Sequence, residues 1–183
     1  MKRCEVRIIG GAWRSRRIRF EERPGLRPTP DRVRETLFNW LGQDLSGQDC
    51  LDLYAGSGAL GFEAASRGAR RVAMVERDKV ALRALQSNAT LLAAGAVEVV
   101  HADALEFLRQ HRGRYDVVFL DPPFADDCWL QLLAALPPCL KPGALVYCER
   151  AEALDDMPGW TVFRSGRAGQ VSHQLLKRAE HEQ

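Results

Sequence analysis

Short apolar runs and amphipathic segments alternate along the chain from residue 49 onward. The apolar runs are typical of strands and fall near 49–54, 71–76, 96–100, 115–120 and 144–149. Segments with helical spacing separate them and fall near 59–67, 78–93, 103–111 and 127–136. Such alternation predicts an α/β fold with a mostly parallel sheet and helices on both faces. Two runs, 72–75 and 117–120, are apolar throughout, as expected of strands buried on both sides.

The residues before this pattern predict a small appendage. A β-prone stretch at 6–9 is followed by a turn at Gly10 and Gly11 and by alternating basic and apolar residues over 16–20. This order indicates a β-hairpin. A connector rich in glycine and proline follows over 24–30.

Two further elements flank the alternating region. A helix is expected over roughly 30–42, with Thr29 as its N-cap and Pro30 at the first helical position. Near the end of the chain, strand-like runs at about 160–164 and 171–177 follow the last predicted helix and strand. They predict an antiparallel pair that closes one edge of the sheet.

Length and composition indicate a folded globular protein. With 183 residues, of which 46% are hydrophobic and 27% charged, the chain does not fit the disordered, collagen-like or membrane classes. We expect a hairpin extension and connector over 1–28 and one domain over 29–183. The first residues lack the unbroken apolar stretch of a signal peptide or membrane span, which favours a cytoplasmic protein. The five cysteines are scattered and never form C-x-x-C, so we expect neither a disulfide framework nor a metal site.

Positive charge is concentrated at the start of the chain. Residues 1–34 contain eleven lysines and arginines against four acidic residues, whereas the rest contains 15 basic and 20 acidic residues. Phosphate contacts supply most of the non-specific affinity of proteins for nucleic acids, so this distribution favours a polyanionic partner. A solvated arginine-rich face is the alternative. The candidate contacts are Arg7, Arg14, Arg16, Arg17, Arg19, Arg27, Arg32 and Arg34.

The first predicted strand of the sheet runs into a glycine-rich turn. Residues 56–61 read G-x-G-x-x-G, and glycines there let a ligand approach the backbone and the N–H groups of the following helix. An acidic residue, Glu76, ends the next strand, where it can accept hydrogen bonds from both hydroxyls of a ribose. The candidate cofactor residues are Ala55, Gly56, Ser57, Gly58, Glu76 and Arg77. These features fit NAD as well as S-adenosylmethionine.

Two more carboxylates bear on the choice of cofactor. Asp52 precedes the glycine turn, where it would repel a pyrophosphate but could bind the ammonium of a methionine moiety, directly or through water. Asp103, followed by Ala104, comes after the third predicted strand and could accept a hydrogen bond from the amino group of adenine. Asp103 is also a suitable N-cap for the next helix, and the two roles are compatible.

The fourth predicted strand ends in the sequence Asp121-Pro122-Pro123-Phe124. Successive prolines fix the backbone, so the Asp121 carboxylate and the Pro122 carbonyl can face one point beyond the strand. Two such acceptors match the two N–H bonds of a planar amino group. Phe124 offers a ring against which a base can stack, and such stacking contributes about 1–3 kcal/mol in single-strand binders. A strand-ending turn with a buried phenylalanine is the structural alternative.

Taken together, these motifs resemble the RsmD family of 16S ribosomal RNA guanine-N2 methyltransferases. The similarity covers the blocks 6–14, 25–38, 52–61, 121–124 and 168–171. The glycine and Asp-Pro-Pro-Phe motifs occur in many amine methyltransferases, whereas the arginine-rich first block is far more particular to this family. The expectation of an rRNA substrate therefore rests on that block. Ser15 stands where the family usually has glycine.

The resemblance implies a Rossmann-like class I methyltransferase fold with a seven-stranded sheet and S-adenosylmethionine as the donor. It implies the guanine at position 966 of 16S rRNA as acceptor, in an assembling small ribosomal subunit, and we expect a monomer. The family's cofactor motifs fall on Asp52, Gly56, Gly58 and Glu76. Its adenine-side acid falls on Asp103, and its catalytic loop falls on 121–124.

Three alternatives remain on sequence grounds. A DNA adenine-N6 methyltransferase shares the Asp-Pro-Pro-Phe motif and the donor, although little chain remains for a target-recognition domain. An NAD-dependent oxidoreductase would explain the glycine turn but neither Asp52 nor Asp121. An inactive RNA-binding module would explain the basic first block but not the intact catalytic motif.

Overall fold

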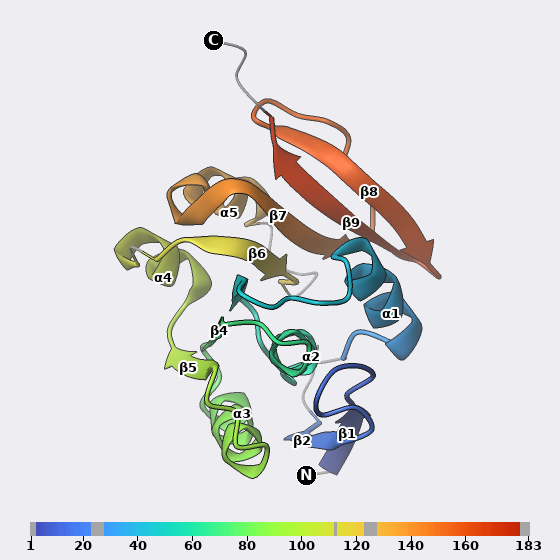
Figure 1. The fold of residues 1–183 in the computed structure, drawn as a ribbon. Helices are drawn as coiled ribbons and strands as arrows, with labels where there is room; N and C mark the ends of the chain where they lie inside the picture. The colour runs from blue at the N-terminus through green and yellow to red at the C-terminus, as the bar shows by residue number, and fades with distance from the viewer. Residues whose placement is uncertain (1–2, 23–27, 112, 123–127, 180–183) are drawn as a thin grey trace.

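The computed structural model describes residues 3–22, 28–111, 113–122 and 128–179. A seven-stranded sheet with the order β5-β4-β3-β6-β7-β9-β8 forms its centre, and β9 runs antiparallel to the other six strands (Figure 1). The strands are β3 (Asp49–Asp52), β4 (Arg71–Glu76), β5 (Val97–His101), β6 (Tyr115–Leu120), β7 (Leu140–Arg150), β8 (Trp160–Ala168) and β9 (Val171–Arg178). The predicted parallel sheet with an antiparallel pair at one edge is confirmed.

The helices divide between the two faces of the sheet. They are α1 (Asp31–Trp40), α2 (Ala59–Ser66), α3 (Lys79–Leu91), α4 (Ala104–Gln110), α5 (Trp129–Ala135) and the short 3₁₀ helix η1 (Pro137–Cys139). Buried side chains of α1, α2 and α3 share one hydrophobic core with one face of the sheet, and those of α4 and α5 share a second core with the other. No helix in the described ranges is long and apolar enough to cross a membrane.

The starts of α1 and β7 differ from the prediction, and β8 extends to Ala168, beyond the predicted end at 164. Pro30 is the N-cap of α1 and not its first helical residue, and no side chain caps this helix. The reason lies in Thr29, whose hydroxyl makes a hydrogen bond with Glu149 on β7 and so does not cap the helix. The second error concerns β7, which begins at Leu140 because this residue pairs with Tyr115 ahead of an irregularity in the β6–β7 register.

A two-stranded hairpin, β1 (Arg3–Arg7) and β2 (Arg17–Glu21), precedes α1. Its buried side chains Val6, Ile8, Ile18 and Phe20 belong to the same hydrophobic core as α1, α2 and α3. Strand β1 ends earlier than predicted, since the N–H groups of Ile9 and the following Gly10 bond to Glu63 of α2 and not to a partner strand. The hairpin is therefore packed against the sheet domain.

Close backbone contacts explain the glycine pair between the strands. A Cβ atom on Gly11, which has φ 72°, would lie 1.8 Å from the carbonyl oxygen of Ser66 at the end of α2. The Ser66 hydroxyl donates to the Gly10 carbonyl at 2.6 Å and accepts from the N–H of Trp13 at 2.9 Å. Ser15 has φ 70°, a conformation that favours glycine, which accounts for the usual residue at this position.

The hairpin also contacts α3 through an amide side chain. Asn88, which is buried, accepts a hydrogen bond from the Arg19 N–H at 3.0 Å and donates to the Arg19 carbonyl at 2.8 Å. It thereby pairs with the outer edge of β2 as a neighbouring strand would. The hairpin is thus held by α2 on one side and by α3 on the other.

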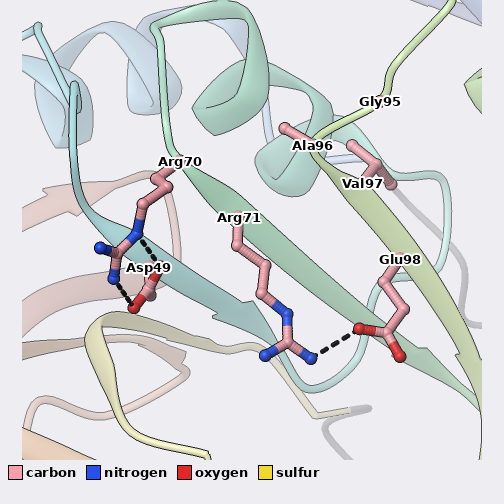
Figure 2. Close-up of a pocket in the computed structure, with 7 residues that line it drawn as sticks. All are labelled: Asp49, Arg70, Arg71, Gly95, Ala96, Val97 and Glu98. Atoms are coloured by element: carbon pink, nitrogen blue, oxygen red, sulfur yellow. Dashed lines mark hydrogen bonds and ion pairs between the residues drawn. The ribbon is translucent and has the colours of Figure 1, made fainter.

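A pocket lies at the amino-terminal edge of β3, β4 and β5. Figure 2 shows that its charged side chains pair with one another: Arg70 with Asp49, and Arg71 with Glu98. Open α/β sheets bind their ligands at the opposite edge, where the strands have their carboxyl ends. The functional site is therefore expected at that opposite edge.

Candidate active site

The functional carboxylates meet at the carboxyl-terminal edge of the sheet. The strand order reverses between β3 and β6, and ligands of open α/β sheets bind at such a point. Asp52, the last residue of β3, is in register with Met74 of β4 and Phe119 of β6. Glu76, the last residue of β4, and Asp121, the first residue after β6, therefore each lie two positions beyond Asp52 in this register.

The glycine turn has the backbone geometry that the sequence predicts. Gly56 and Gly58 have φ angles of 48° and 83°, and a Cβ atom on Gly58 would lie 2.6 Å from the ring of Phe62. Glu76 accepts hydrogen bonds from the N–H of Gly56 at 2.9 Å and of Asp78 at 2.7 Å. Each carboxylate oxygen keeps a further lone pair, so Glu76 both shapes the turn and can accept a hydroxyl.

The neighbours of these glycines line the same turn. Ala55 and Ser57 are buried, and the Ser57 hydroxyl accepts from the N–H of Ala59 at 3.3 Å. This hydrogen bond joins Ser57 to the first residue of α2.

Asp52 is a buried carboxylate. It is 3% exposed and accepts the N–H of Gly61 at 3.1 Å, and no described residue forms an ion pair with it. Burial, together with the nearby Glu76 carboxylate, raises the pKa of Asp52 to about 7. A cation bound beside it would stabilise the ionised form. The Asp52 carboxylate therefore fits the ammonium of a methionine moiety and does not fit a pyrophosphate.

Asp103 lies further along the same edge, after β5. Its carboxylate accepts the N–H groups of Leu105 and Glu106, so it is the N-cap of α4. Arg77 approaches Asp103 to 4.0 Å and is exposed, whereas Ala104 is buried in the first turn of α4. The N-cap role is confirmed, and contact of Asp103 with an adenine stays a prediction.

Asp121 follows β6 and lies next to a second acid. Leu120 pairs with Cys148, so Asp121 neighbours Glu149 at the end of β7. Burial and the carboxylates of Glu149 and Asp52 raise the pKa of Asp121 well above its usual value. Pro122 is buried beside it. Pro123 and Phe124 lie outside the described residues.

Sequence reasoning missed Glu149 and the groups that hold it. Glu149 is 8% exposed and accepts a hydrogen bond from the Tyr147 hydroxyl at 2.9 Å and another from Thr29. Burial raises the pKa of Glu149, and these two hydrogen bonds lower it; the effect of burial is the larger. A usable signal was present, because an acid that ends an otherwise apolar predicted strand repeats the pattern of Asp52 and Glu76.

The structure corrects one candidate RNA contact. Arg34 is fully buried, and its guanidinium bonds to Glu63, to Asp31 and to the carbonyl oxygens of Thr29 and Arg7. It joins α1 to α2 and to the hairpin and is inaccessible to RNA. The prediction was wrong because a count of charges does not distinguish a surface arginine from one that fills a buried acidic site.

The other arginines of this set differ in their pairing. Three are exposed and form ion pairs: Arg7 with Asp31, and both Arg17 and Arg19 with Glu5. Arg14, Arg16 and Arg32 are also exposed, and Arg16 donates to the Leu91 carbonyl. Arg27 lies outside the described residues. The arginines of this set that are both exposed and without an ion pair are therefore fewer than the sequence count suggests.

Comparison with known proteins assigns the chain to a family. The family model described as Conserved hypothetical protein 95 matches residues 6–177. The ribosomal RNA small subunit methyltransferase D of Escherichia coli K12 is 42% identical over 180 residues, which cover 95% of this chain and 90% of that protein. The chain belongs to the RsmD family.

Solved structures agree with this membership. The Escherichia coli protein yhhF has 41% identity and a TM-score of 0.84, covering 96% of this chain and 98% of its own. An RNA methyltransferase from Salinibacter ruber, solved with S-adenosyl-L-homocysteine, shares the fold at 22% identity and a TM-score of 0.65, covering 81% of this chain and 92% of its own. This RsmD chain thus has a class I methyltransferase fold, as predicted.

Proposed function

We propose that this chain transfers a methyl group from S-adenosylmethionine to the exocyclic N2 of a guanine in the 16S rRNA of a small ribosomal subunit. One observation carries the proposal: the buried Asp52 beside the glycine turn and the Asp121-Pro122 strand end lie on adjacent strands at the switch point. Relatives in the RsmD family bear the name ribosomal RNA small subunit methyltransferase D. We propose an assembling subunit as substrate and a monomer as the acting form.

The residues at the glycine turn fit the donor. Asp52 would bind its ammonium, Glu76 its ribose hydroxyls, and Asp103 the amino group of its adenine, with Ala55, Gly56, Ser57 and Gly58 presenting backbone to it. When bound, the donor supplies a methyl group on a positively charged sulfur. The buried carboxylate of Asp52 disfavours NAD, because a pyrophosphate would face an unpaired negative charge.

The strand end after β6 would act on the acceptor. The lone pair of a guanine N2 is delocalised into the ring, so the amino group is a poor nucleophile until it begins to pyramidalise. The Asp121 carboxylate and the Pro122 carbonyl would hold its two N–H bonds and stabilise the positive charge that grows on nitrogen. In its ionised form the Asp121 carboxylate can also accept the proton that N2 releases on methylation. Phe124 would stack on the splayed base.

Loss of the Glu76 carboxylate should weaken donor binding. We expect Glu76→Ala to lower the affinity for S-adenosylmethionine at least tenfold, since charge-assisted hydrogen bonds contribute about 1.5–3 kcal/mol each. The variant also frees the Gly56 N–H that shapes the turn. Calorimetric titration measures the change, and Glu98→Ala at the opposite edge of the sheet is the control. An unchanged dissociation constant would remove Glu76 from the donor site.

Two hairpin arginines should contribute phosphate contacts. Arg14 and Arg16 are exposed and, in the described part of the chain, lack an ion pair, unlike Arg17 and Arg19. We expect charge reversal at Arg14 and Arg16 to lower the slope of log affinity against log salt by roughly 0.7–0.9 for each phosphate that is no longer neutralised. RNA binding measured over a salt series tests this. Slopes equal to wild type would mean that both side chains face solvent in the complex.

The choice of guanine N2 is tested with modified RNA. Inosine lacks only the N2 amino group, so its substitution at the target should abolish methyl transfer and leave binding largely intact, since phosphate contacts carry no base information. Guanine, inosine and adenine versions of one rRNA fragment, or of reconstituted subunits, are compared for binding and methyl incorporation. Robust incorporation into the adenine version would favour an adenine-N6 activity, and incorporation into the inosine version would exclude N2.

A further inference from the structure

The last two strands carry basic residues and no acidic residue. Residues 157–179 contain four cations, at Arg164, Arg167, Lys177 and Arg178, and no carboxylate. Within the described residues, none of the four forms an ion pair, and the nearby Asp156 instead accepts the N–H of Val162 at 2.7 Å. This contrasts with the hairpin at the start of the chain, where Glu5 pairs with two arginines.

One aromatic ring holds two of these cations together. The Lys177 ammonium lies 3.7 Å and the Arg164 guanidinium carbon 4.3 Å from the centroid of the partly buried Phe163 ring. Both contacts are favourable cation–π geometry, but the two like charges repel each other. The Arg164 guanidinium also donates to the backbone carbonyl of Phe163. Among the described residues no carboxylate pairs with either cation, so an anionic ligand would relieve this repulsion.

The position of the surface places it beside the active site. Arg164 pairs with Leu175 of β9, which pairs with Tyr147 of β7, and Tyr147 pairs with Phe119 of β6, two positions before Asp121. Leu175, Tyr147 and Phe119 belong to the core shared with α1, so Arg164 lies on that face of the sheet. Three strand spacings, roughly 14 Å, separate β6 from β8. An RNA strand bound at Asp121 spans that distance within a few nucleotides.

Helix α1 connects this surface to the hairpin at the start of the chain. Its Arg34 bonds to the Arg7 carbonyl of β1, and its Trp40 stacks on His173 of β9 with ring centroids 5.3 Å apart. In Figure 1, α1 lies between the β1–β2 hairpin and the β8–β9 pair. Arg32 is exposed on this helix. Basic groups thus occur on both sides of α1 and on α1 itself.

We propose that the β8–β9 pair is a second RNA-binding surface, in which Arg164 and Lys177 contact backbone phosphates of the strand that enters the active site. Phe163 positions both cations for that contact. The proposal rests on the proposed rRNA methyltransferase function, and it adds a contact surface that the arginine-rich start of the chain does not provide.

The test compares charge removal with charge exchange at the same two positions. Arg164→Gln/Lys177→Gln leaves two phosphates without their cations, so the log–log salt slope for rRNA binding should fall by roughly 1.4–1.8. In Arg164→Lys/Lys177→Arg, both charges remain and the slope should stay at the wild-type value. Arg70→Gln/Arg71→Gln, at the far edge of the sheet (Figure 2), removes the same net charge and should leave the slope unchanged.

The outcomes separate this proposal from the proposed function. A wild-type slope in the charge-removal variant, in an enzyme that methylates rRNA, would overturn the second surface alone. A reduced slope in a protein that binds rRNA but transfers no methyl group would support the surface and overturn the function. Weaker binding to the subunit with unchanged binding to protein-free rRNA would assign the surface to a ribosomal protein and so overturn the RNA contact.

Discussion

Asp121→Ala should lower the single-turnover rate of methyl transfer by roughly 10²–10³ and leave the affinity for S-adenosylmethionine nearly unchanged. The reason is that a preorganised acceptor acts on charge that develops only in the transition state, and removal of one such group typically has this effect. Asp121 lies after β6, whereas the donor residues Asp52 and Glu76 end β3 and β4, and Asp103 follows β5. Rapid-quench measurement with bound donor isolates the chemical step.

Two further variants sharpen this prediction. Asp121→Asn keeps an acceptor oxygen but cannot take up a proton, so a rate between those of wild type and Asp121→Ala would separate the two contributions of the carboxylate. Asp155→Ala, at an exposed acid before β8, is the matched control and should react at the wild-type rate. A near wild-type rate for Asp121→Ala would show that Asp121 has only a structural role.

Glu63→Ala should destabilise the protein by about 3–5 kcal/mol, the usual effect of removing one partner of a buried ion pair. Glu63 is fully buried and accepts four hydrogen bonds, from the N–H groups of Ile9 and Gly10 and from Arg34 and Arg67. Its loss would leave the buried guanidinium of Arg34 without one of its two carboxylates. The free energy of unfolding from denaturant titration measures the effect.

The control for this variant is an exposed glutamate on a neighbouring helix. Glu35→Ala on α1 should change the free energy of unfolding by less than about 0.5 kcal/mol, as is usual for surface positions. A destabilisation below about 1 kcal/mol for Glu63→Ala would mean that the hairpin does not depend on this carboxylate, because that is well short of the usual effect. In that case the hairpin should also keep its protection against proteolysis in the variant.

The sheet was predictable because its central strands are buried on both faces. Only apolar side chains are stable there, so the runs around Val72 and Val118 stand out from their polar surroundings. The donor-side acids were predictable for a related reason. Asp52 and Glu76 each end such a run, and the carboxyl ends of parallel strands meet at one edge.

Features that depend on tertiary contacts could not be predicted from the sequence. Arg34 looks like one more cation of a basic segment until Glu63 and Asp31 are seen around it. Thr29 has the right residue type and position for an N-cap. Its hydroxyl instead forms a hydrogen bond with Glu149, which is 120 residues away in sequence. The basic residues of β8 and β9 did not stand out in the sequence, because the chain after residue 34 contains more acidic than basic residues.

The proposed guanine-N2 methyltransferase activity is tested most directly by methyl transfer to small ribosomal subunits that lack the modification. The protein is incubated with labelled S-adenosylmethionine and unmethylated subunits, and the modified nucleotide is mapped. We expect one labelled guanine of 16S rRNA, carrying the methyl group on N2, and no label with Asp121→Ala on the same time scale. Label on another base or in protein, or no label with the wild-type chain, would contradict the proposed activity.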